Sequence, residues 1–315
     1  MPSPGAWGCC SPPSLGCRST AWSAPCDLFH ATEHLLPPLR RTRSVLTVHD
    51  LIFRFFPEHH LPLNRWYLTL MMPRFLRAAD AIIAVSEQTR RDLSALYGVA
   101  PERVWVIPEG VNPRFRPPDH PAAITALRER LGLPERFILY LGTIEPRKNL
   151  LTLLEAYRAL VAAGETADLV IAGRRGWLFA PVFARVRELG LEQRVHFTGW
   201  VAEEDLPFLL AAAQVFAFPS EYEGFGLPPL EAMAVGTPVV AANAAALPEV
   251  VGDAGLLVPP RDVAALAAAL QRVLSDEELA RTLRARGLAR ARRFSWEKAA
   301  LETLAVYRAV VGGCR

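Results

Sequence analysis

The sequence predicts an α/β fold made of two doubly wound domains, the first of which is incomplete. From residue 27 onward, short β-branched runs alternate with helical stretches, which is the pattern of parallel α/β architecture. A proline-rich segment, residues 112–120, interrupts the alternation and is the best linker candidate in the chain. At 315 residues, the chain is long enough for two domains of ordinary size.

Four buried strands and two helices are expected before the linker. The predicted strands are Leu28–His30, Ser44–Val48, Ala81–Val85 and Val104–Ile107, and the predicted helices are Trp66–Arg77 and Gln88–Leu96. A complete doubly wound unit has more strands than this, and the series begins abruptly. We therefore expect the first domain to be cut short.

The segment after the linker predicts a complete doubly wound unit, with ligands at the carboxyl ends of its strands. A final helix, Trp296–Val311, follows it and could cap either domain. The predicted strands are Phe137–Leu141, Leu169–Ala172, Val195–Thr198, Val215–Phe218, Pro238–Ala241 and Gly255–Val258, with helices between them that include Leu150–Ala163 and Asp262–Leu274.

These elements divide the chain into five parts: residues 1–26, a partial N-terminal domain (27–113), a linker (114–121), a C-terminal domain (122–295) and a C-terminal helix (296–315). The first 26 residues are rich in Ser, Pro, Gly and Cys and show neither a helical nor a strand period. They also lack the basic start and the apolar core of a signal peptide. We expect this segment to be disordered or not native to the fold.

The five cysteines leave two interpretations open: a disulfide or metal cluster at the N-terminus, or a chance grouping outside the domains. Metal spacing would require a Cys-x2-Cys pair with a partner pair, and the sequence contains none, which favours the chance grouping. The cysteines are Cys9, Cys10, Cys17, Cys26 and Cys314.

Composition excludes several classes of protein. Hydrophobic residues make up 51% of the chain and charged residues 21%, as in a globular protein rather than a disordered one. A net charge of +3 is too small to predict a nucleic-acid partner. No run reaches the roughly 18 consecutive apolar residues that span a bilayer, so any membrane contact is expected to be peripheral.

An anion site is predicted where a loop enters a helix, in residues 218–238 (FPSEYEGFGLPPLEAMAVGTP). Pro228 and Pro229 open this helix, because proline is favoured at the first helical position. Before them, Gly224 and Gly226 place free backbone N–H groups and the positive end of the helix dipole at the mouth of the sheet. Such a site is suited to a diphosphate.

Two carboxylates frame this turn, Glu223 in the loop and Glu231 in the first helical turn. Each has an ordinary explanation when taken alone. A carboxylate near a helix N-terminus is favoured by about 0.3–1 kcal/mol, and Glu223, with Glu221 beside it, would suit a solvated acidic loop. Together, at this spacing around a glycine turn, they form a fork for sugar and ribose hydroxyls.

A second phosphate-binding candidate lies in residues 140–150 (YLGTIEPRKNL). Gly142 makes a turn after a strand, and Arg147 and Lys148 precede a helix. A basic pair could be an ordinary solvated surface, but the chain has only two lysines, Lys148 and Lys298. A lysine beside an arginine suits phosphate, because a point charge and a planar fork bind it in different ways.

The sequence predicts no cofactor. It contains no Asp-x-Asp pair that could hold a divalent metal on a diphosphate, so protein cations and helix dipoles would have to neutralise the leaving group. It also has no Gly-x-Gly-x-x-Gly after any predicted strand, which excludes a dehydrogenase of the usual kind.

A third candidate is His49, just past a buried strand in residues 46–50 (LTVHD). A lone histidine is more often structural than functional. Its neighbourhood adds context, because TVHD is followed by residues 81–93 (AIIAVSEQTRRDL) and residues 106–112 (VIPEGVN).

These motifs together resemble the family 4 glycosyltransferases, which have the GT-B fold of two Rossmann-like domains facing a cleft. The turn at residues 220–231 is similar to the Glu-x7-Glu signature of that family, and residues 140–150 to its Arg-Lys motif. The segments around His49 resemble the N-terminal domain, with Glu109 in place of the Asn often found there. The resemblance covers most of the chain and is closest to bacterial mannosyltransferase-like enzymes of surface polysaccharide assembly. The segments LVIAG, VHFTGWV and FSWEK also match.

The resemblance implies a role for each motif residue. Glu223 would contact the donor sugar and His49 would lie beside it, so these two are the catalytic candidates. Glu231 would hold the ribose hydroxyls, while Arg147 and Lys148 would neutralise the departing diphosphate. The donor-binding candidates are Gly142, Arg147, Lys148, Phe225, Gly226, Leu227 and Glu231.

The implied function is transfer of a sugar from a nucleotide sugar to a glycan or lipid-linked acceptor, with retention and without metal. Resemblance to the branch alone favours GDP-mannose as donor, and implies a cytoplasmic enzyme in peripheral contact with the inner membrane surface. The first strand and glycine-rich loop of the family have no counterpart here. A truncated, inactive nucleotide-sugar-binding module or partner subunit is therefore the alternative, and a sugar-nucleotide epimerase fits the motifs less well.

Overall fold

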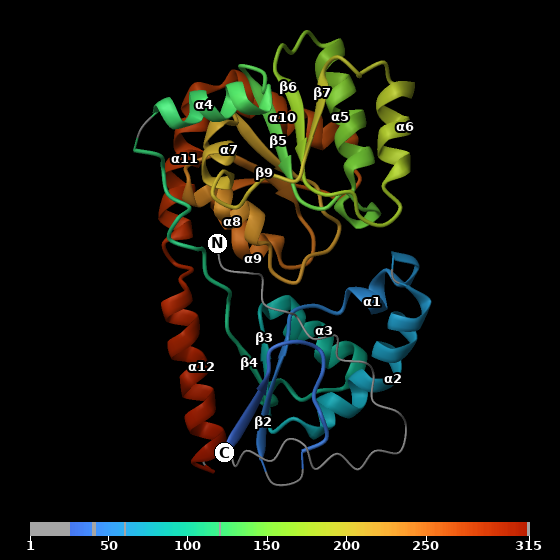
Figure 1. Ribbon diagram of the computed structural model, residues 1–315, viewed down its shortest axis with the longest axis vertical. Coiled ribbons are helices and arrows are strands. Elements are labelled where there is room, and N and C mark those ends of the chain that lie inside the picture. Colours follow the sequence, from blue (N-terminus) through green and yellow to red (C-terminus); the bar gives the residue numbers. More distant parts are fainter. Residues whose placement is uncertain (1–25, 40–41, 60, 120, 314–315) are drawn as a thin grey trace, which may run out of the picture.

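The computed structural model describes residues 26–39, 42–59, 61–119 and 121–313 and consists of two α/β domains stacked along the long axis of the molecule (Figure 1). Each domain is built on one parallel sheet. The predictions for the N-terminal segment, and four of the five cysteines, lie outside the described residues. The remaining one, Cys26, is exposed and has a free thiol.

The N-terminal domain has a four-stranded sheet in the order β1-β2-β3-β4. All four predicted strands are confirmed, each to within one residue at its ends. The strands are β1 (Leu28–Ala31), β2 (Arg43–Val48), β3 (Ala81–Ala84) and β4 (Val104–Val106).

Helices cover both faces of this sheet. Because side chains alternate along a strand, Leu46 and Ile82 face one side, where they pack with α2 (Pro62–Ala78) and α3 (Glu87–Tyr97). Their neighbours Val45 and Ile83 face the other side, where they pack against Val306 of α12 (Trp296–Val311). The last helix therefore returns to the N-terminal domain, and a short helix, α1 (Ile52–Phe55), precedes α2.

Local sequence signals explain where these helices begin and end. The α2 helix starts at Pro62, four residues before the predicted start, because proline occupies the first helical turn without losing a hydrogen bond. The α3 helix is capped by Ser86, whose side chain accepts a hydrogen bond from the Thr89 N–H. It ends at Gly98, which has the left-handed conformation (φ 63°) typical of this position.

The C-terminal domain has a six-stranded sheet in the order β10-β9-β8-β5-β6-β7. Its strands are confirmed to within one residue of the predicted ends. They are β5 (Phe137–Leu141), β6 (Asp168–Ala172), β7 (Val195–Gly199), β8 (Val215–Phe218), β9 (Val239–Ala242) and β10 (Gly255–Val258).

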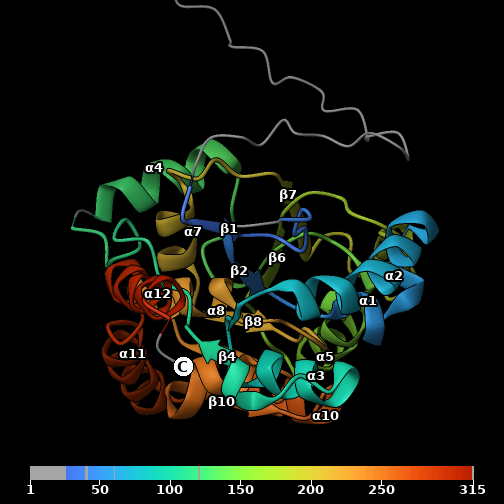
Figure 2. The same cartoon turned by 90° about the horizontal axis from the view of Figure 1, so that it is seen from below.

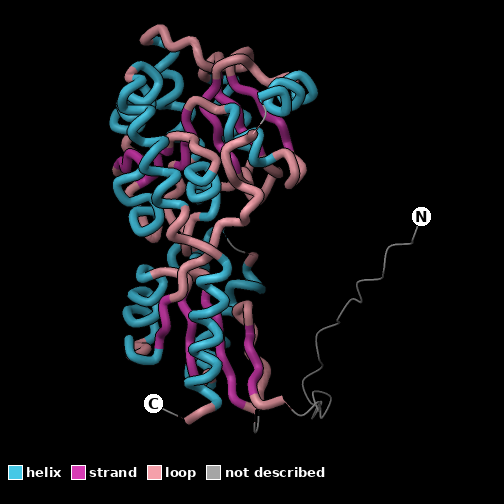
Figure 3. The backbone as a smooth tube through the Cα atoms, turned by 90° about the vertical axis from the view of Figure 1, so that its left-hand side faces the viewer, coloured by secondary structure: helices cyan, strands magenta, loops and turns pink. Residues whose placement is uncertain are grey.

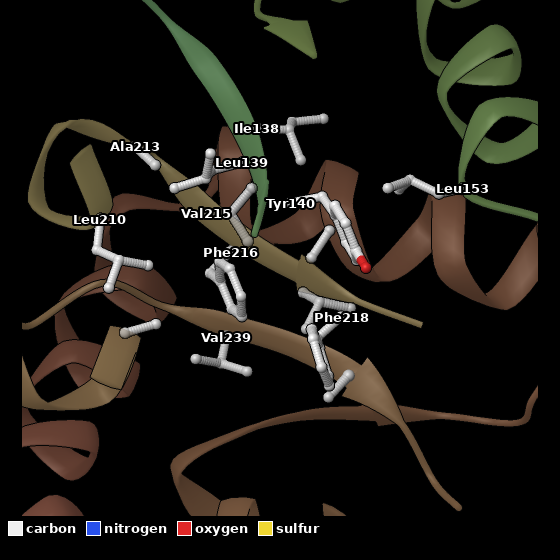
Figure 4. Packing of buried hydrophobic residues seen from close by; sticks show 14 of the residues in the cluster. Ile138, Leu139, Tyr140, Leu153, Leu210, Ala213, Val215, Phe216, Phe218 and Val239 are labelled. Atoms are coloured by element: carbon white, nitrogen blue, oxygen red, sulfur yellow. The ribbon is translucent and has the colours of Figure 1, made fainter. Parts of the chain in front are cut away.

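Eight helices pack around this sheet among the described residues and enclose one large core. Phe216, Phe218 and Tyr140 are fully buried at its centre and are stacked against one another (Figure 4). The helices are α4 (Pro121–Leu131), α5 (Leu150–Ala162), α6 (Ala180–Glu188), α7 (Leu206–Ala212), α8 (Leu227–Ala234), α9 (Leu247–Val251), α10 (Val263–Ser275) and α11 (Glu277–Ala291).

The strand order reverses between β5 and β8. The chain proceeds from β5 outward through β6 to β7, and from β8 outward through β9 to β10. In open α/β sheets, the crevice at the carboxyl ends of such a strand pair is where ligands bind. The loops that follow Leu141 and Phe218 therefore mark the candidate site.

Two segments pass from one domain to the other, and Figure 3 shows them side by side where the domains meet. The Val111 N–H donates to the Phe294 carbonyl at 3.2 Å. A Cβ on Gly110 would lie 2.2 Å from the backbone nitrogen of Trp296, so only glycine fits this crossing. The predicted linker is less open than expected, because Phe115 is buried in the C-terminal core.

Beyond this crossing, α12 runs along the N-terminal domain (Figure 1). Its Tyr307 hydroxyl lies 2.5 Å from Nδ1 of His30 in β1. No helix among the described residues is long and apolar enough to cross a membrane.

Candidate functional site

The two motif loops of the C-terminal domain meet at the reversal of strand order. Gly142 follows β5 directly and has a φ of 154°, while a Cβ on Gly173, after β6, would lie 1.9 Å from the Gly142 carbonyl oxygen. Gly173 is therefore required by the close approach of two backbones, and Gly142 by its positive φ. The loop after β8 carries Ser220 and Glu223 to the same edge of the sheet.

A buried ion cluster joins these loops. The Lys148 Nζ donates to Oε1 of Glu223 at 2.6 Å, and an Arg147 nitrogen lies 3.0 Å from Oε2. The Ser220 hydroxyl also donates to Oε1, at 2.6 Å. The three charged side chains are only 11–13% exposed. Burial alone would raise the pKa of Glu223, but the positive charges of Lys148 and Arg147 outweigh it and lower the pKa, so the carboxylate is ionised.

Backbone geometry fixes the two cations. They belong to a short 3₁₀ helix, Pro146–Lys148, which ends at Asn149 in the left-handed conformation (φ 56°). The Asn149 amide donates to the Pro219 carbonyl across the two loops at 3.2 Å. Arg147 is held further by the Glu145 carboxylate at 2.6 Å and by the Tyr222 carbonyl at 2.7 Å.

This arrangement differs from the roles that the motifs imply. The resemblance assigns Glu223 to the sugar and the two cations to the diphosphate, whereas here the three side chains form one ion-paired group. An arriving phosphate would have to compete with Glu223 for the cations. Motif reasoning missed the positioning residues Ser220, Glu145, Asn149 and Tyr222, because their contacts depend on how the two loops fold together.

The N-terminus of α8 faces the same crevice. Its N-cap is Gly226, with φ 118° and no side-chain cap, so the first N–H groups are not satisfied by a side chain. Phe225 is buried, with its ring edge-on to Phe294 at 5.7 Å, while Leu227 begins the helix. This end of α8 thus combines backbone donors with the positive end of a helix dipole.

Glu231 does not lie in the first turn of α8, as predicted, but is its fifth residue. The helix begins at Leu227, before the two prolines that were expected to open it. Burial raises the pKa of Glu231 to about 7, opposed in part by the charge of Arg114. Its carboxylate therefore titrates near neutrality, unlike that of Glu223.

Gly224 has a different role from the predicted one. A Cβ at this position would lie 1.9 Å from the His49 carbonyl oxygen, so its glycine lets the C-terminal loop touch the N-terminal domain. The Thr89 hydroxyl is shared between the carbonyls of His49 and Gly224, at 3.3 and 3.4 Å. The structure thus brings His49 next to the loop that carries Glu223.

The His49 side chain lies between two acceptors. Its Nδ1 is 3.1 Å from Oε1 of Glu109, and its Nε2 is 3.0 Å from the Thr32 carbonyl. The hydrogen bond with Glu109 raises the pKa of His49 to about 9, burial opposes this shift, and the Thr32 carbonyl and the charge of Glu33 add to it. The ring is therefore an imidazolium at neutral pH. Glu109, which stands where the family motif often has Asn, is the partner that stabilises this positive charge.

A further contact ties the two domains together beside this site. The Tyr222 hydroxyl donates to the Asp92 carboxylate at 2.6 Å, and the Phe55 ring stacks on the Tyr222 ring at 5.0 Å. A cavity of about 300 Å³ opens between these groups and the Glu221 side of the loop. Among the described residues, no group of three His, Cys, Asp or Glu side chains could hold a metal ion.

Two family models match the two domains. The model of "Glycosyl transferases group 1" matches residues 124–290, and that of "Glycosyltransferase Family 4" matches residues 19–115. The O-antigen chain mannosyltransferase B of Escherichia coli is 36% identical over 282 residues, covering 89% of this chain and 74% of that protein. The serotype-specific mannosyltransferase WbdA of Escherichia coli is 34% identical over 82% of this chain, which spans only 32% of its length.

Solved structures agree with this assignment. Sucrose-phosphate synthase from Thermosynechococcus elongatus has a TM-score of 0.77 and 31% identity, covering 91% of this chain and 74% of that one. Anabaena HepE in complex with UDP-glucose has a TM-score of 0.73 and 26% identity, covering 85% and 72%. With a family model matching each domain and two facing parallel sheets, the chain belongs to the family 4 glycosyltransferases and has the GT-B fold.

Proposed function

We propose that this glycosyltransferase moves mannose from GDP-mannose to a hydroxyl of a glycan or lipid-linked acceptor, with retention and without a metal ion. The observation that carries the proposal is the ion cluster of Glu223, Arg147 and Lys148 at the reversal of strand order, beside the uncapped start of α8. The choice of mannose rests on the two mannosyltransferase relatives.

The proposed chemistry depends on the placement of charge. Lys148, Arg147 and the α8 N-terminus would stabilise the negative charge that builds on the departing diphosphate. Glu223, ionised beside the sugar, would stabilise positive charge developing at the anomeric carbon. As the phosphate draws the cations toward itself, the carboxylate becomes available to the sugar, so donor binding would open the pairs seen here. Glu231 would accept hydrogen bonds from the ribose.

Metal independence follows in this proposal from the same group of charges. Two cations and a helix dipole can neutralise the charge of the departing diphosphate, as a divalent ion does in other enzymes. Retention rests in this proposal on membership of the family. Proton NMR of the first product would measure the anomeric configuration directly.

The test is donor binding and turnover with a panel of GDP-, UDP- and ADP-sugars in the presence of EDTA. We expect GDP-mannose to bind best and to be hydrolysed slowly when no acceptor is present. Lys148→Ala should weaken donor binding by at least about tenfold, because a charge-assisted phosphate contact is lost. Lys298→Ala is the matched control, since it removes the only other lysine from an exposed position on α12.

The outcomes separate the alternatives. Binding without hydrolysis or transfer would favour a nucleotide-sugar-binding module over an enzyme. If no nucleotide sugar binds, the proposed function is wrong. If turnover requires a divalent ion, metal independence is wrong while the assignment of the donor site stands.

A further inference from the structure

The His49 ring lies between two hydrogen-bond acceptors, and their positions decide how many protons the ring carries. Its Nδ1 is 3.1 Å from a carboxylate oxygen of Glu109, and its Nε2 is 3.0 Å from the carbonyl oxygen of Thr32. A neutral imidazole has one N–H and one lone pair, so either tautomer would place a lone pair against an acceptor. Both contacts therefore need a proton between their atoms.

The proton between Nδ1 and Glu109 resides on the ring. An imidazole is a stronger base than a carboxylate by about two pKa units, and water still reaches the pair, since the His49 side chain is 38% exposed. Glu109 is thus a carboxylate and His49 an imidazolium. The charge follows from the two contacts, and the raised pKa of His49 agrees with it.

The two partners of the ring differ in strength. Glu109 is a charged acceptor, which makes a stronger hydrogen bond than the neutral Thr32 carbonyl. The contact of Nε2 with Thr32 is also the more exposed of the two. A ligand oxygen can therefore replace the carbonyl at Nε2 while Glu109 stays on Nδ1. A carboxylate that orients one ring nitrogen while the other acts on the substrate is a recurrent arrangement in enzymes.

The pair lies on the edge of the N-terminal sheet that faces the donor site. His49, Glu109 and Thr32 follow β2, β4 and β1, at the strand ends directed toward the C-terminal domain (Figure 1). Seen from below, β2 lies near the middle of the molecule, with α12 to one side and α1 and α2 to the other (Figure 2). A Cβ on Gly224 would overlap the His49 carbonyl oxygen, so the loop that carries Glu223 touches this residue.

We propose that Glu109 is a positioning residue for sugar transfer: it orients the His49 ring and keeps it doubly protonated, so that Nε2–H donates a charged hydrogen bond to an oxygen of the bound nucleotide sugar. The identity of that ligand rests on the proposed function. His49 would act as a cationic hydrogen-bond donor and not as a general base, because neither ring nitrogen has a free lone pair. Arg147 and Lys148 would act on the donor from the opposite wall.

The other titratable side chains around the ring leave His49 as the cation of this group. The negative charge of Glu33, after β1, favours the imidazolium. Burial and the charge of His49 lower the pKa of His30. Burial also lowers the pKa of His34, where the charges of Asp50 and Glu33 oppose the shift and that of His49 adds to it. His30 and His34 are therefore biased toward their neutral forms.

The elements on the far side of His49 add charge that is already paired. Glu223, in the C-terminal loop, is ion-paired within its own domain. The α3 helix presents the neutral hydroxyl of Thr89, which donates to the His49 carbonyl at 3.3 Å. Glu109 thus remains the largest influence on the charge of the ring.

The test is the pH dependence of kcat/KM for GDP-mannose hydrolysis without acceptor, in the wild type and in Glu109→Gln. In the wild type, kcat/KM should fall as the pH rises through about 9. The amide of the variant can accept from Nδ1 but cannot hold a second proton on the ring, so the fall should move toward pH 6.5. At about pH 8.5 the variant should be at least about tenfold below the wild type, and at about pH 6 within about twofold.

This pH dependence distinguishes positioning from a structural role, which would lower kcat/KM by the same factor at every pH. Glu109→Asp retains a carboxylate and should keep the fall at a higher pH than Glu109→Gln. Glu102→Gln is the matched control, because Glu102 is exposed just before β4, at the other end of the strand that leads to Glu109. It should leave the profile unchanged.

A double-mutant cycle tests whether Glu109 acts through His49. His49→Ala should lower kcat/KM by at least about tenfold, because a charged hydrogen bond to the donor is lost. Adding Glu109→Gln to His49→Ala should then cause no further loss at high pH. Thermal unfolding verifies that each variant is folded.

Two results would overturn this proposal while the proposed function stands. One is that the wild type hydrolyses GDP-mannose and Glu109→Gln has a parallel pH profile. The other is that Glu109→Gln lowers kcat/KM by the same factor with and without His49. If the wild type neither binds nor hydrolyses any nucleotide sugar, the proposed function is wrong and this proposal fails with it.

Discussion

The two sides of the domain junction each present a carboxylate beside a cation, and they differ in how deeply the pair is buried. On the C-terminal side, Glu223 and its partners Lys148 and Arg147 are almost inaccessible to water. On the N-terminal side, the His49 side chain is 38% exposed and pairs with Glu109 alone.

The difference determines what each pair contributes. A deeply buried pair costs desolvation energy when it forms, and removing one partner leaves an uncompensated charge, so a single substitution in the pair is strongly destabilising. A half-exposed pair is screened by water and contributes little to stability, but it can still set a protonation state. In the protein without a donor, the Glu223 cluster is therefore a stable arrangement of charge, while the protonation of the His49–Glu109 pair can change with pH.

The largest effect is expected from removing the carboxylate of the buried cluster. Glu223→Ala leaves Lys148 and Arg147 close together with one less counter-charge, and should lower the free energy of unfolding by about 3–5 kcal/mol. Urea unfolding measures it. The control is Glu221→Ala in the same loop, whose partner Arg261 is 72% exposed, so its cost should stay below about 1 kcal/mol. Equal costs would show that burial does not distinguish these pairs.

The next largest effect on stability is expected from a substitution that forces the two domains apart at their contact. Gly224→Ala places a Cβ against the His49 carbonyl and should cost about 1–3 kcal/mol as the domains shift to accommodate it. Thermal unfolding and small-angle scattering would report the loss of stability and the opening. Gly287→Ala is the control, because its Cβ would meet only Met233 at 3.3 Å or more. An unchanged Gly224→Ala protein would contradict this close approach.

An effect that depends on pH should appear in the stability through Glu231. Its folded pKa is raised from 4.5 to about 7, so the folded state binds the proton more tightly than the unfolded state. The contribution is fully present below 4.5 and is lost as pH rises through about 7. Glu231→Gln stays neutral and should remove this decline, which urea unfolding at several pH values would show. Glu203→Gln, at an exposed neighbour, should retain it.

The smallest effect on stability is expected at Glu109, where the change is in the protonation of His49. Glu109→Gln should lower the pKa of His49 from about 9 toward 6.5. In the wild type, the contribution of the protonated His49 to the free energy of unfolding is present below pH 6.5 and is lost as the pH rises through about 9. In the variant, this contribution is lost at a lower pH. NMR titration of the imidazole measures both.

Glu33→Gln is the control for this last prediction, because Glu33 acts on His49 through charge alone and should lower the pKa less. If the pKa of His49 is unchanged in Glu109→Gln, the imidazolium does not depend on its pair with Glu109.

Much of the fold could be predicted from the sequence. All ten strands appear within one residue of their expected ends, because the buried strands of a parallel sheet are short continuous apolar runs bounded by loops. The side on which the last helix would pack could not be predicted. Its Val306 fits between Val45 and Ile83, and a helical period does not specify which sheet supplies the matching surface.

The candidate site could also be predicted only in part. Motif spacing identified Glu223, Lys148 and Arg147 as site candidates. It did not show that they pair with one another, since Lys148 and Glu223 lie 75 residues apart in the chain. Gly224 was taken for part of an anion site because a glycine turn before a helix suggests one. Its contact with His49 depends on the docking of two domains.

By itself, the sequence determined the strands of the two sheets and the identity of the charged residues, because these follow from local patterning and residue chemistry. Only the tertiary structure decided which charges are paired and how deeply they are buried. These properties lower the pKa of Glu223 and raise the pKa values of Glu231 and His49. Desolvation and neighbouring charge cause the shifts, and both arise only when distant segments are packed together.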